Sequence, residues 1–143
     1  MNENNAPILV VDDEPDMCWI LENIISKSGF TFKTALNARK ALALIECNKF
    51  CMAFLDAKLP DIDGLELARQ LRKTDANLLI VIVSGCFYQD DQTIEEALHS
   101  GLITAFIAKP FDHYEIVSVI TRYETSREFP PFISGMDSIE TIP

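Results

Sequence analysis

Positive charge is scarce in this chain: 12 Lys and Arg residues stand against 22 Asp and Glu residues, for a formal net charge of −10. Proteins that bind the nucleic-acid backbone use clustered Lys and Arg side chains to neutralise phosphates. The composition therefore argues against direct binding to nucleic acid.

Long apolar segments are also missing. No run approaches the roughly 18 apolar residues that a membrane-spanning helix requires. The first seven residues, MNENNAP, have neither the basic stretch nor the apolar stretch of a secretory signal. We therefore expect a cytoplasmic protein with no membrane segment.

Paired cysteines are absent as well. The four cysteines form no CxxC motif and lie mostly within apolar segments, at Cys18, Cys47, Cys51 and Cys86. This arrangement favours reduced, packed thiols over disulfides or a zinc site. We expect Cys86 to be an ordinary core or loop residue.

The chain does contain a regular alternation of short apolar runs with segments whose apolar residues recur at helical spacing. Its 143 residues, 48% of them hydrophobic, suit one compact domain. Strands are predicted at residues 8–11, 32–35, 52–55, 78–83 and 105–108, mostly without the polar alternation of a half-exposed sheet. The segments after them have helical periodicity. The first helix is expected to begin at Pro15 and to end before Gly29, and the last opens with Asp112 and Glu115 at capping-box spacing.

This alternation predicts an α/β fold. Five strand-helix units suit a flavodoxin-like, doubly wound five-stranded parallel sheet with strand order 2-1-3-4-5 and helices on both faces. We expect a domain at residues 7–124, an N-terminal tail at 1–6, and a C-terminal tail or linker start at 125–143. That last stretch is rich in proline and could be disordered or could dock through Phe129 and Phe132.

Polar residues follow four of the predicted strands. In such sheets ligands bind at the carboxyl ends of the strands, where the sequence places Asp12, Asp13, Asp56, Ser84 and Lys109. Three neighbouring carboxylates repel one another unless a cation lies among them. The oxygen-rich set predicts Mg²⁺, with Mn²⁺ as the alternative ion. One carboxylate could then attack a phosphoryl donor, although these arguments do not say which.

Four motifs add a family resemblance. ILVVDDEPD, FLDAKLPDIDG, IVIVSG and IAKPFD, in this order, resemble the receiver domains of two-component response regulators, such as the chemotaxis regulators, over about residues 7–124. The resemblance implies a signalling switch that accepts a phosphoryl group from a sensor histidine kinase or a histidine phosphotransfer protein. Such a switch is not an enzyme in the usual sense, although it catalyses its own phosphorylation and dephosphorylation.

The resemblance also implies the role of each residue. Asp56 would be the phosphoacceptor, and the metal would be held by Asp12, Asp13, Asp56 and the backbone carbonyl of Lys58. Lys109 would contact the phosphoryl group, and its peptide bond to Pro110 would be cis. The conformational switch would use the hydroxyl of Ser84 and the aromatic ring of Phe106.

Phosphorylation would then reshape the face made by the fourth helix, fifth strand and fifth helix, and so alter binding to a downstream protein. The molecule would be a monomer or a phosphorylation-dependent dimer. Two other roles stay open: a phosphate carrier or sink in a phosphorelay, and the isolated receiver of a longer regulator. A flavodoxin-type cofactor site is disfavoured because DDEPD is acidic where a phosphate loop would be needed. A metal-dependent phosphatase is the closest enzyme alternative.

Overall fold

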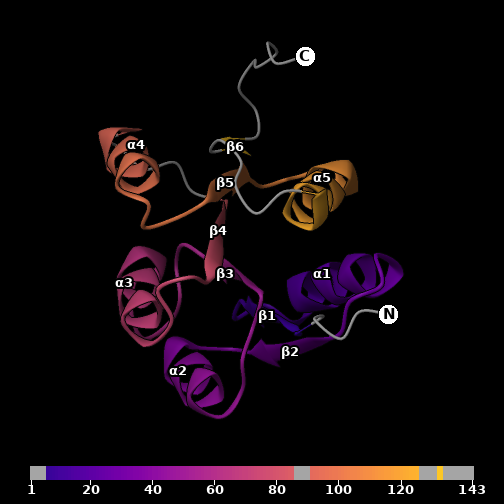
Figure 1. Ribbon diagram of the computed structural model, residues 1–143, viewed down its shortest axis with the longest axis horizontal. Coiled ribbons are helices and arrows are strands. Elements are labelled where there is room, and N and C mark those ends of the chain that lie inside the picture. The colour runs from indigo at the N-terminus through magenta and orange to yellow at the C-terminus, as the bar shows by residue number, and fades with distance from the viewer. Residues whose placement is uncertain (1–5, 86–90, 126–131, 134–143) are drawn as a thin grey trace.

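The computed structural model describes residues 6–85, 91–125 and 132–133. Strands and helices alternate along them (Figure 1). The elements are β1 (Ile8–Val11), α1 (Pro15–Lys27), β2 (Phe32–Ala35), α2 (Ala38–Cys47), β3 (Met52–Asp56), α3 (Gly64–Thr74), β4 (Leu79–Ser84), α4 (Asp91–Ser100), β5 (Ala105–Ala108), α5 (His113–Thr125) and β6 (Phe132–Ile133).

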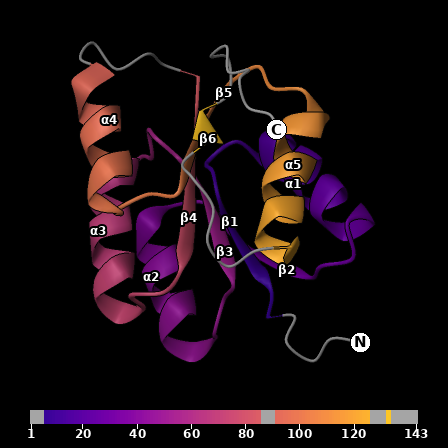
Figure 2. The same cartoon turned by 45° about the horizontal axis from the view of Figure 1, so that its top comes forward.

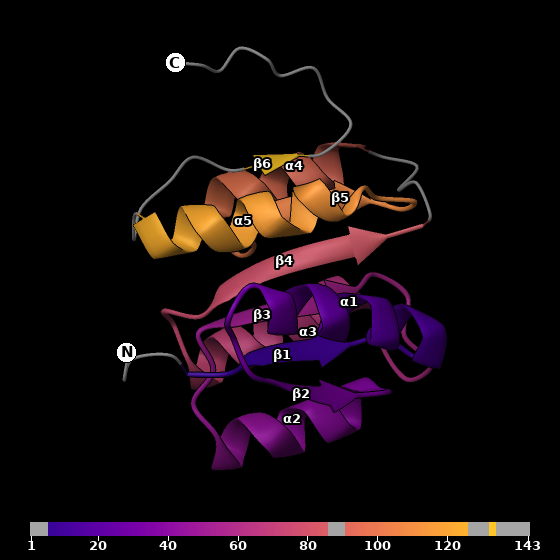
Figure 3. The ribbon, with the colours of Figure 1, turned by 90° about the vertical axis from the view of Figure 1, so that its right-hand side faces the viewer.

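The five predicted strands form a parallel sheet in the order β2-β1-β3-β4-β5, as the sequence predicted. Figure 3 shows this order from β2 at one edge to β5 near the other. The predicted strand ends differ from the observed ones by at most one residue, which is the usual uncertainty of such boundaries. The flavodoxin-like fold is therefore confirmed.

A short sixth strand extends the sheet beyond this prediction. β6 pairs in parallel with β5, with Ala105 opposite Phe132 and Phe106 opposite Ile133. Two residues are too few to show a periodic pattern, so sequence reasoning could not find this strand inside residues 125–143. Phe129 lies outside the described residues. The division of the chain into one domain and two tails stays a prediction.

Two hydrophobic cores cover the two faces of the sheet. Helices α2, α3 and α4 lie on one face, and α1 and α5 lie on the other (Figures 1 and 2). The strands contribute alternate residues to each core, so that Leu9 packs on one side and Val10 on the other, both fully buried. Burial on both faces explains why the inner strands β1, β3 and β4 are almost continuously apolar in sequence.

The helix ends follow the sequence signals. Pro15 is the first residue of α1, and Gly29, with a φ of 91°, ends the turn that follows it. At the start of α5, Glu115 Oε1 accepts from the backbone N–H of Asp112 at 3.0 Å, which is one half of the predicted capping box. Asp112 Oδ1 accepts from the N–H of Tyr114 at 3.3 Å instead of that of Glu115.

Arg72, near the end of α3, joins three chain segments. Its guanidinium donates to the carbonyl oxygens of Ala76 at 3.1 Å and Leu102 at 2.7 Å, and also to that of Leu78. The bonds tie α3 to the segments that lead into β4 and β5. In the part of the chain that the structure describes, no helix is long and apolar enough to cross a bilayer.

Candidate functional site

The carboxyl edge of the sheet collects the polar residues that the sequence placed at the strand ends. Asp12 and Asp13 follow β1, Asp56 is the last residue of β3, Ser84 is the last of β4, and Lys109 follows β5. These strands are neighbours in a parallel sheet, so their ends meet at one edge. The order of the strands, not proximity in the sequence, brings these five residues together.

Three of these residues form a carboxylate cluster. One oxygen each of Asp12, Asp13 and Asp56 lie within 4.8 Å of one another. Asp12 is 1% exposed and Asp56 is 9% exposed, whereas Asp13 faces solvent. The cluster is thus built on two buried carboxylates and opens to solvent at the third.

Lys109 supplies positive charge to the cluster. Its Nζ lies 3.1 Å from Asp12 Oδ2 and 3.7 Å from Asp56 Oδ1, and its side chain is only 14% exposed. Its backbone N–H donates to the carbonyl oxygen of Ser84 at 2.8 Å, which joins β4 to the segment after β5. The Lys109–Pro110 peptide bond is cis.

The pKa values reflect this crowding. Burial raises the pKa of Asp56, and the negative charge of Asp12 raises it further, against the lowering effect of Lys109. Burial alone would lower the pKa of Lys109, but the hydrogen bond and charge of Asp12 outweigh burial and raise it. Lys109 therefore stays an ammonium ion, whereas the ionised form of Asp56 is disfavoured.

Asp12 is held in place by local bonds. Its Oδ1 accepts from the backbone N–H of Glu14 at 2.9 Å, and its backbone carbonyl accepts from the thiol of Cys18 at 3.3 Å. Burial is the main reason that the pKa of Cys18 is raised to about 11, so this thiol is unreactive at neutral pH. Sequence reasoning grouped Cys18 with packed thiols and missed its contact with the site.

The segment after Asp56 packs closely against the end of β3. The N–H of Gly64 donates to the carbonyl oxygen of Ala57 at 2.8 Å. A Cβ atom on Gly64 would lie 2.3 Å from the backbone oxygen of Asp56, so no larger residue fits without displacement. Gly64 stands where this segment meets α3. The structure shows that it is the first residue of α3 and that what it provides is space.

The two residues that the resemblance implies for the switch lie on neighbouring strands, Ser84 at the end of β4 and Phe106 within β5. Ser84 is 3% exposed. Phe106 is half-buried and packs against the core cluster that includes Ile94 and Leu98 of α4. The backbone N–H of Lys58 lies 3.4 Å from Asp56 Oδ1.

The donor set fits a hard divalent cation. Carboxylate and carbonyl oxygens are the ligands that Mg²⁺ prefers, and few protein ligands leave positions for water and a phosphoryl oxygen. In the described residues the cluster contains three carboxylates and no histidine or thiolate. Cys18 reaches only the backbone carbonyl of Asp12. The site therefore suits Mg²⁺ or Mn²⁺ rather than Zn²⁺.

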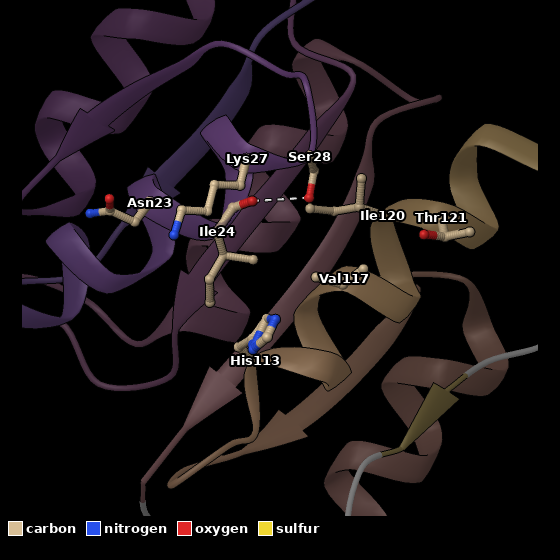
Figure 4. A pocket seen from close by; sticks show the side chains of 8 residues that line it. All are labelled: Asn23, Ile24, Lys27, Ser28, His113, Val117, Ile120 and Thr121. Atoms are coloured by element: carbon tan, nitrogen blue, oxygen red, sulfur yellow. Dashed lines mark hydrogen bonds between the residues drawn. The ribbon is translucent and has the colours of Figure 1, made fainter.

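A separate groove lies between α1 and α5 (Figure 4). It has a volume of about 430 Å³ and includes none of the strand-end residues. Its walls combine apolar and polar side chains, from Asn23, Ile24, Lys27, Ser28, His113, Val117, Ile120 and Thr121. The carboxylate cluster, not this groove, is the candidate for chemistry.

Comparison with known proteins identifies the family. The family described as response regulator receiver domain matches residues 8–121. Sporulation initiation phosphotransferase F of Bacillus subtilis is 31% identical over 119 residues, which cover 83% of this chain and 94% of that protein.

Solved structures show the same likeness. The receiver domain of NtrX from Brucella abortus is 36% identical with a TM-score of 0.73, covering 83% of this chain and 99% of that one. A CheY-like receiver domain protein from Methanospirillum hungatei is 27% identical with a TM-score of 0.77, covering 85% of this chain and 95% of that one. Fold and site together define a doubly wound α/β domain with a carboxylate cluster at the carboxyl edge of its sheet. The chain belongs to the response regulator receiver domain family.

Proposed function

We propose that Asp56 accepts a phosphoryl group and that the chain thereby acts as a response regulator. The observation that carries this assignment is the position of Asp56, at the end of the central strand β3, beside Asp12 and Asp13 and 3.7 Å from the ammonium group of Lys109. Asp12 is tied to Glu14 and Lys109 by hydrogen bonds. Asp56 accepts only one long backbone bond among those described, at 3.4 Å, and this leaves its oxygens available to react.

The reaction requires positive charge that offsets the negative charge of the carboxylates and of the phosphoryl oxygens. Asp12, Asp13, Asp56 and the backbone carbonyl of Lys58 would hold Mg²⁺, which would neutralise charge on the phosphoryl oxygens. A carboxylate oxygen of Asp56 attacks phosphorus, the phosphorus–nitrogen bond of a phosphohistidine donor breaks, and an acyl phosphate forms. The ammonium group of Lys109 would then turn from Asp56 toward the new phosphoryl oxygens. Its short distances to Asp12 and Asp56 support this movement.

The switch would follow from the added charge. Phosphorylation of Asp56 brings roughly one further negative charge and new acceptor oxygens to this edge of the sheet. Ser84, at the end of the adjacent strand, would donate its hydroxyl to them, and Phe106 would rotate inward. Since Phe106 packs against the core cluster to which α4 contributes, this rotation would change the surface formed by α4, β5 and α5. The phosphoryl group shifts the population only by its better interaction with that conformer.

The partners follow from this chemistry. The donor would be a sensor histidine kinase or a histidine phosphotransfer protein, and the signal would pass to a downstream protein. The chain would work in the cytoplasm, as a monomer or as a phosphorylation-dependent dimer, and would catalyse only its own phosphorylation and dephosphorylation.

Intact-protein mass spectrometry after incubation with Mg²⁺ and acetyl phosphate tests the acceptor. Wild type should gain the mass of one phosphoryl group, and Asp56→Asn should not. Asp75→Asn is the matched control, since Asp75 follows the last residue of α3, at the end opposite to Gly64 and Asp56. A gain in Asp56→Asn, or none in wild type with either acetyl phosphate or a phosphohistidine protein, would refute the assignment.

A second role, as a phosphate carrier, is favoured by one comparison. The relative named sporulation initiation phosphotransferase F is matched over 94% of its length. Phosphorylated protein mixed with a purified histidine phosphotransfer protein distinguishes the roles. Return of the phosphoryl group to histidine supports the carrier, whereas phosphorylation-dependent binding of another protein without such transfer supports the switch.

A further inference from the structure

The loop between β3 and α3 carries Lys58 and is closed tightly at its neck. Gly64 donates its N–H to the carbonyl oxygen of Ala57 at 2.8 Å, and Lys58 forms an antiparallel bridge with Asp63. These contacts join the two ends of residues 57–63. None of these contacts ties the tip of the loop, residues 59–62, to another element.

The tip is held instead by Asp61, through a contact distant in the sequence. Asp61 Oδ1 accepts from the backbone N–H of Ala38 at 3.0 Å, and Oδ2 accepts from that of Arg39 at 3.0 Å. These are the first two residues of α2, whose N–H groups have no partner within the helix. Oδ1 also accepts from the N–H of Ile62 at 3.2 Å. Both oxygens of one carboxylate thus fasten the loop to another element.

The element to which Asp61 is fastened is firmly placed. Asn37 caps α2 by accepting from the N–H of Lys40 at 2.8 Å, and Ala38 and Ala41 are buried against the sheet. The hydrogen bond from Ala38 is the main cause that lowers the pKa of Asp61, so Asp61 is ionised at neutral pH. Hydrogen bonds to an ionised acceptor are stronger than neutral ones.

We propose that Asp61 is a positioning residue for the cation site, because it ties the loop tip to α2 and thereby orients the backbone carbonyl of Lys58 toward the ion. This inference rests on the proposed function, in which that carbonyl is a metal ligand. Asp61 is exposed and bonds to α2, so it acts through the loop and not by touching the ion.

Calorimetric titration of the full chain with MgCl₂ at 0.15 M KCl tests the proposal. Asp61→Ala should bind Mg²⁺ about 10-fold more weakly than wild type or worse, as is typical when a group that orients a metal ligand is lost. Asn37→Ala is the matched control, because it removes an acceptor from the same end of α2 without touching the loop. It should lower the melting temperature as Asp61→Ala does, yet keep Mg²⁺ affinity within about twofold.

Two further measurements separate position from charge. Asp61→Asn is neutral but keeps one acceptor oxygen, so its affinity should lie between those of wild type and Asp61→Ala. Hydrogen exchange needs no cation: amides of residues 58–62 should exchange faster in Asp61→Ala than in Asn37→Ala.

The outcomes separate a positioning role of Asp61 from an effect of its charge and from failure of the proposed function. Unchanged Mg²⁺ affinity in Asp61→Ala, or an equal loss in Asn37→Ala, would overturn the positioning role. Equal losses in Asp61→Asn and Asp61→Ala without faster loop exchange would assign the effect to charge, and would overturn it too. A wild-type chain that binds no Mg²⁺ would instead refute the proposed function, and the inference would fall with it.

Discussion

Replacing Asp56 with asparagine should stabilise the metal-free protein. The carboxylate of Asp56 is buried beside two other carboxylates, and the ammonium group of Lys109 lies 3.7 Å from it. Burial and Asp12 raise the pKa of Asp56, which means that its ionised form is disfavoured in the folded state. Asparagine has nearly the same shape and carries no charge. The substitution therefore removes repulsion at little cost in packing.

The magnitude follows from the distances. At an effective dielectric constant of about 20, attraction to Lys109 at 3.7 Å is worth roughly 4.5 kcal/mol, and repulsion from a carboxylate at 4.8 Å, the upper limit of the separations in the cluster, roughly 3.5 kcal/mol. Counting Asp12 fully and the exposed Asp13 at about half leaves roughly 1 kcal/mol of net repulsion. Desolvation of the charge adds to this, so we expect Asp56→Asn to gain about 1–2 kcal/mol, or roughly 3–8 °C in Tm.

Thermal unfolding with and without Mg²⁺ measures the effect. In EDTA at neutral pH, Asp56→Asn should melt above wild type. The difference should narrow as the pH falls through the raised pKa of Asp56, because protonation relieves the same repulsion. Added Mg²⁺ at about 10 times its Kd should raise the free energy of unfolding of wild type by about 1.4 kcal/mol. It should raise that of Asp56→Asn far less.

The matched control is Asp75→Asn. Asp75 pairs with Lys49 at 3.7 Å and lies after the end of α3 that is farther from the cluster. This variant should keep the full Mg²⁺ increment of wild type. The reasoning is refuted if Asp56→Asn is less stable than wild type in EDTA, or if Mg²⁺ stabilises both proteins equally.

Gly64→Ala should destabilise the fold by about 2–4 kcal/mol in urea unfolding, since the added Cβ would collide with the backbone oxygen of Asp56. An unchanged urea midpoint would contradict the close approach of Gly64 to that oxygen. Arg72→Ala should lower the free energy of unfolding by about 2–4 kcal/mol, because three backbone carbonyls lose a charged donor. Arg69→Ala, which removes an exposed ion pair, should lower it by less than about 0.5 kcal/mol. Similar losses for the two variants would refute the role of Arg72 in joining the chain segments. The pKa of Asp61 is lowered, so its stabilising contribution is present at neutral pH and is lost as the pH falls below about 4. Urea unfolding of wild type and Asp61→Asn should thus differ at pH 7 and converge in acid, and a constant difference would count against the carboxylate contact.

The local pattern of the amino-acid sequence was enough to predict the class of fold and to propose the residues of the site. Apolar runs such as residues 8–11 and 105–108 are bounded by helical stripes, and burial on both faces of the sheet imposes this local pattern. Asp12, Asp56 and Lys109 could be placed at one edge because a parallel sheet has only one carboxyl edge. The family resemblance then separated the proposed acceptor from the proposed ligands, which spacing alone did not.

Contacts between segments that are distant in the chain could be found only in the folded structure. The bonds from Asp61 to the start of α2, the space required at Gly64 and the pairing of β6 with β5 depend on how whole elements pack together. The distances from Lys109 to two aspartates, which raise its pKa, depend on strand order and on side-chain orientation. Hydrophobic periodicity records which face of an element is buried. It does not record which distant polar atoms meet, because that is fixed only when the elements are assembled.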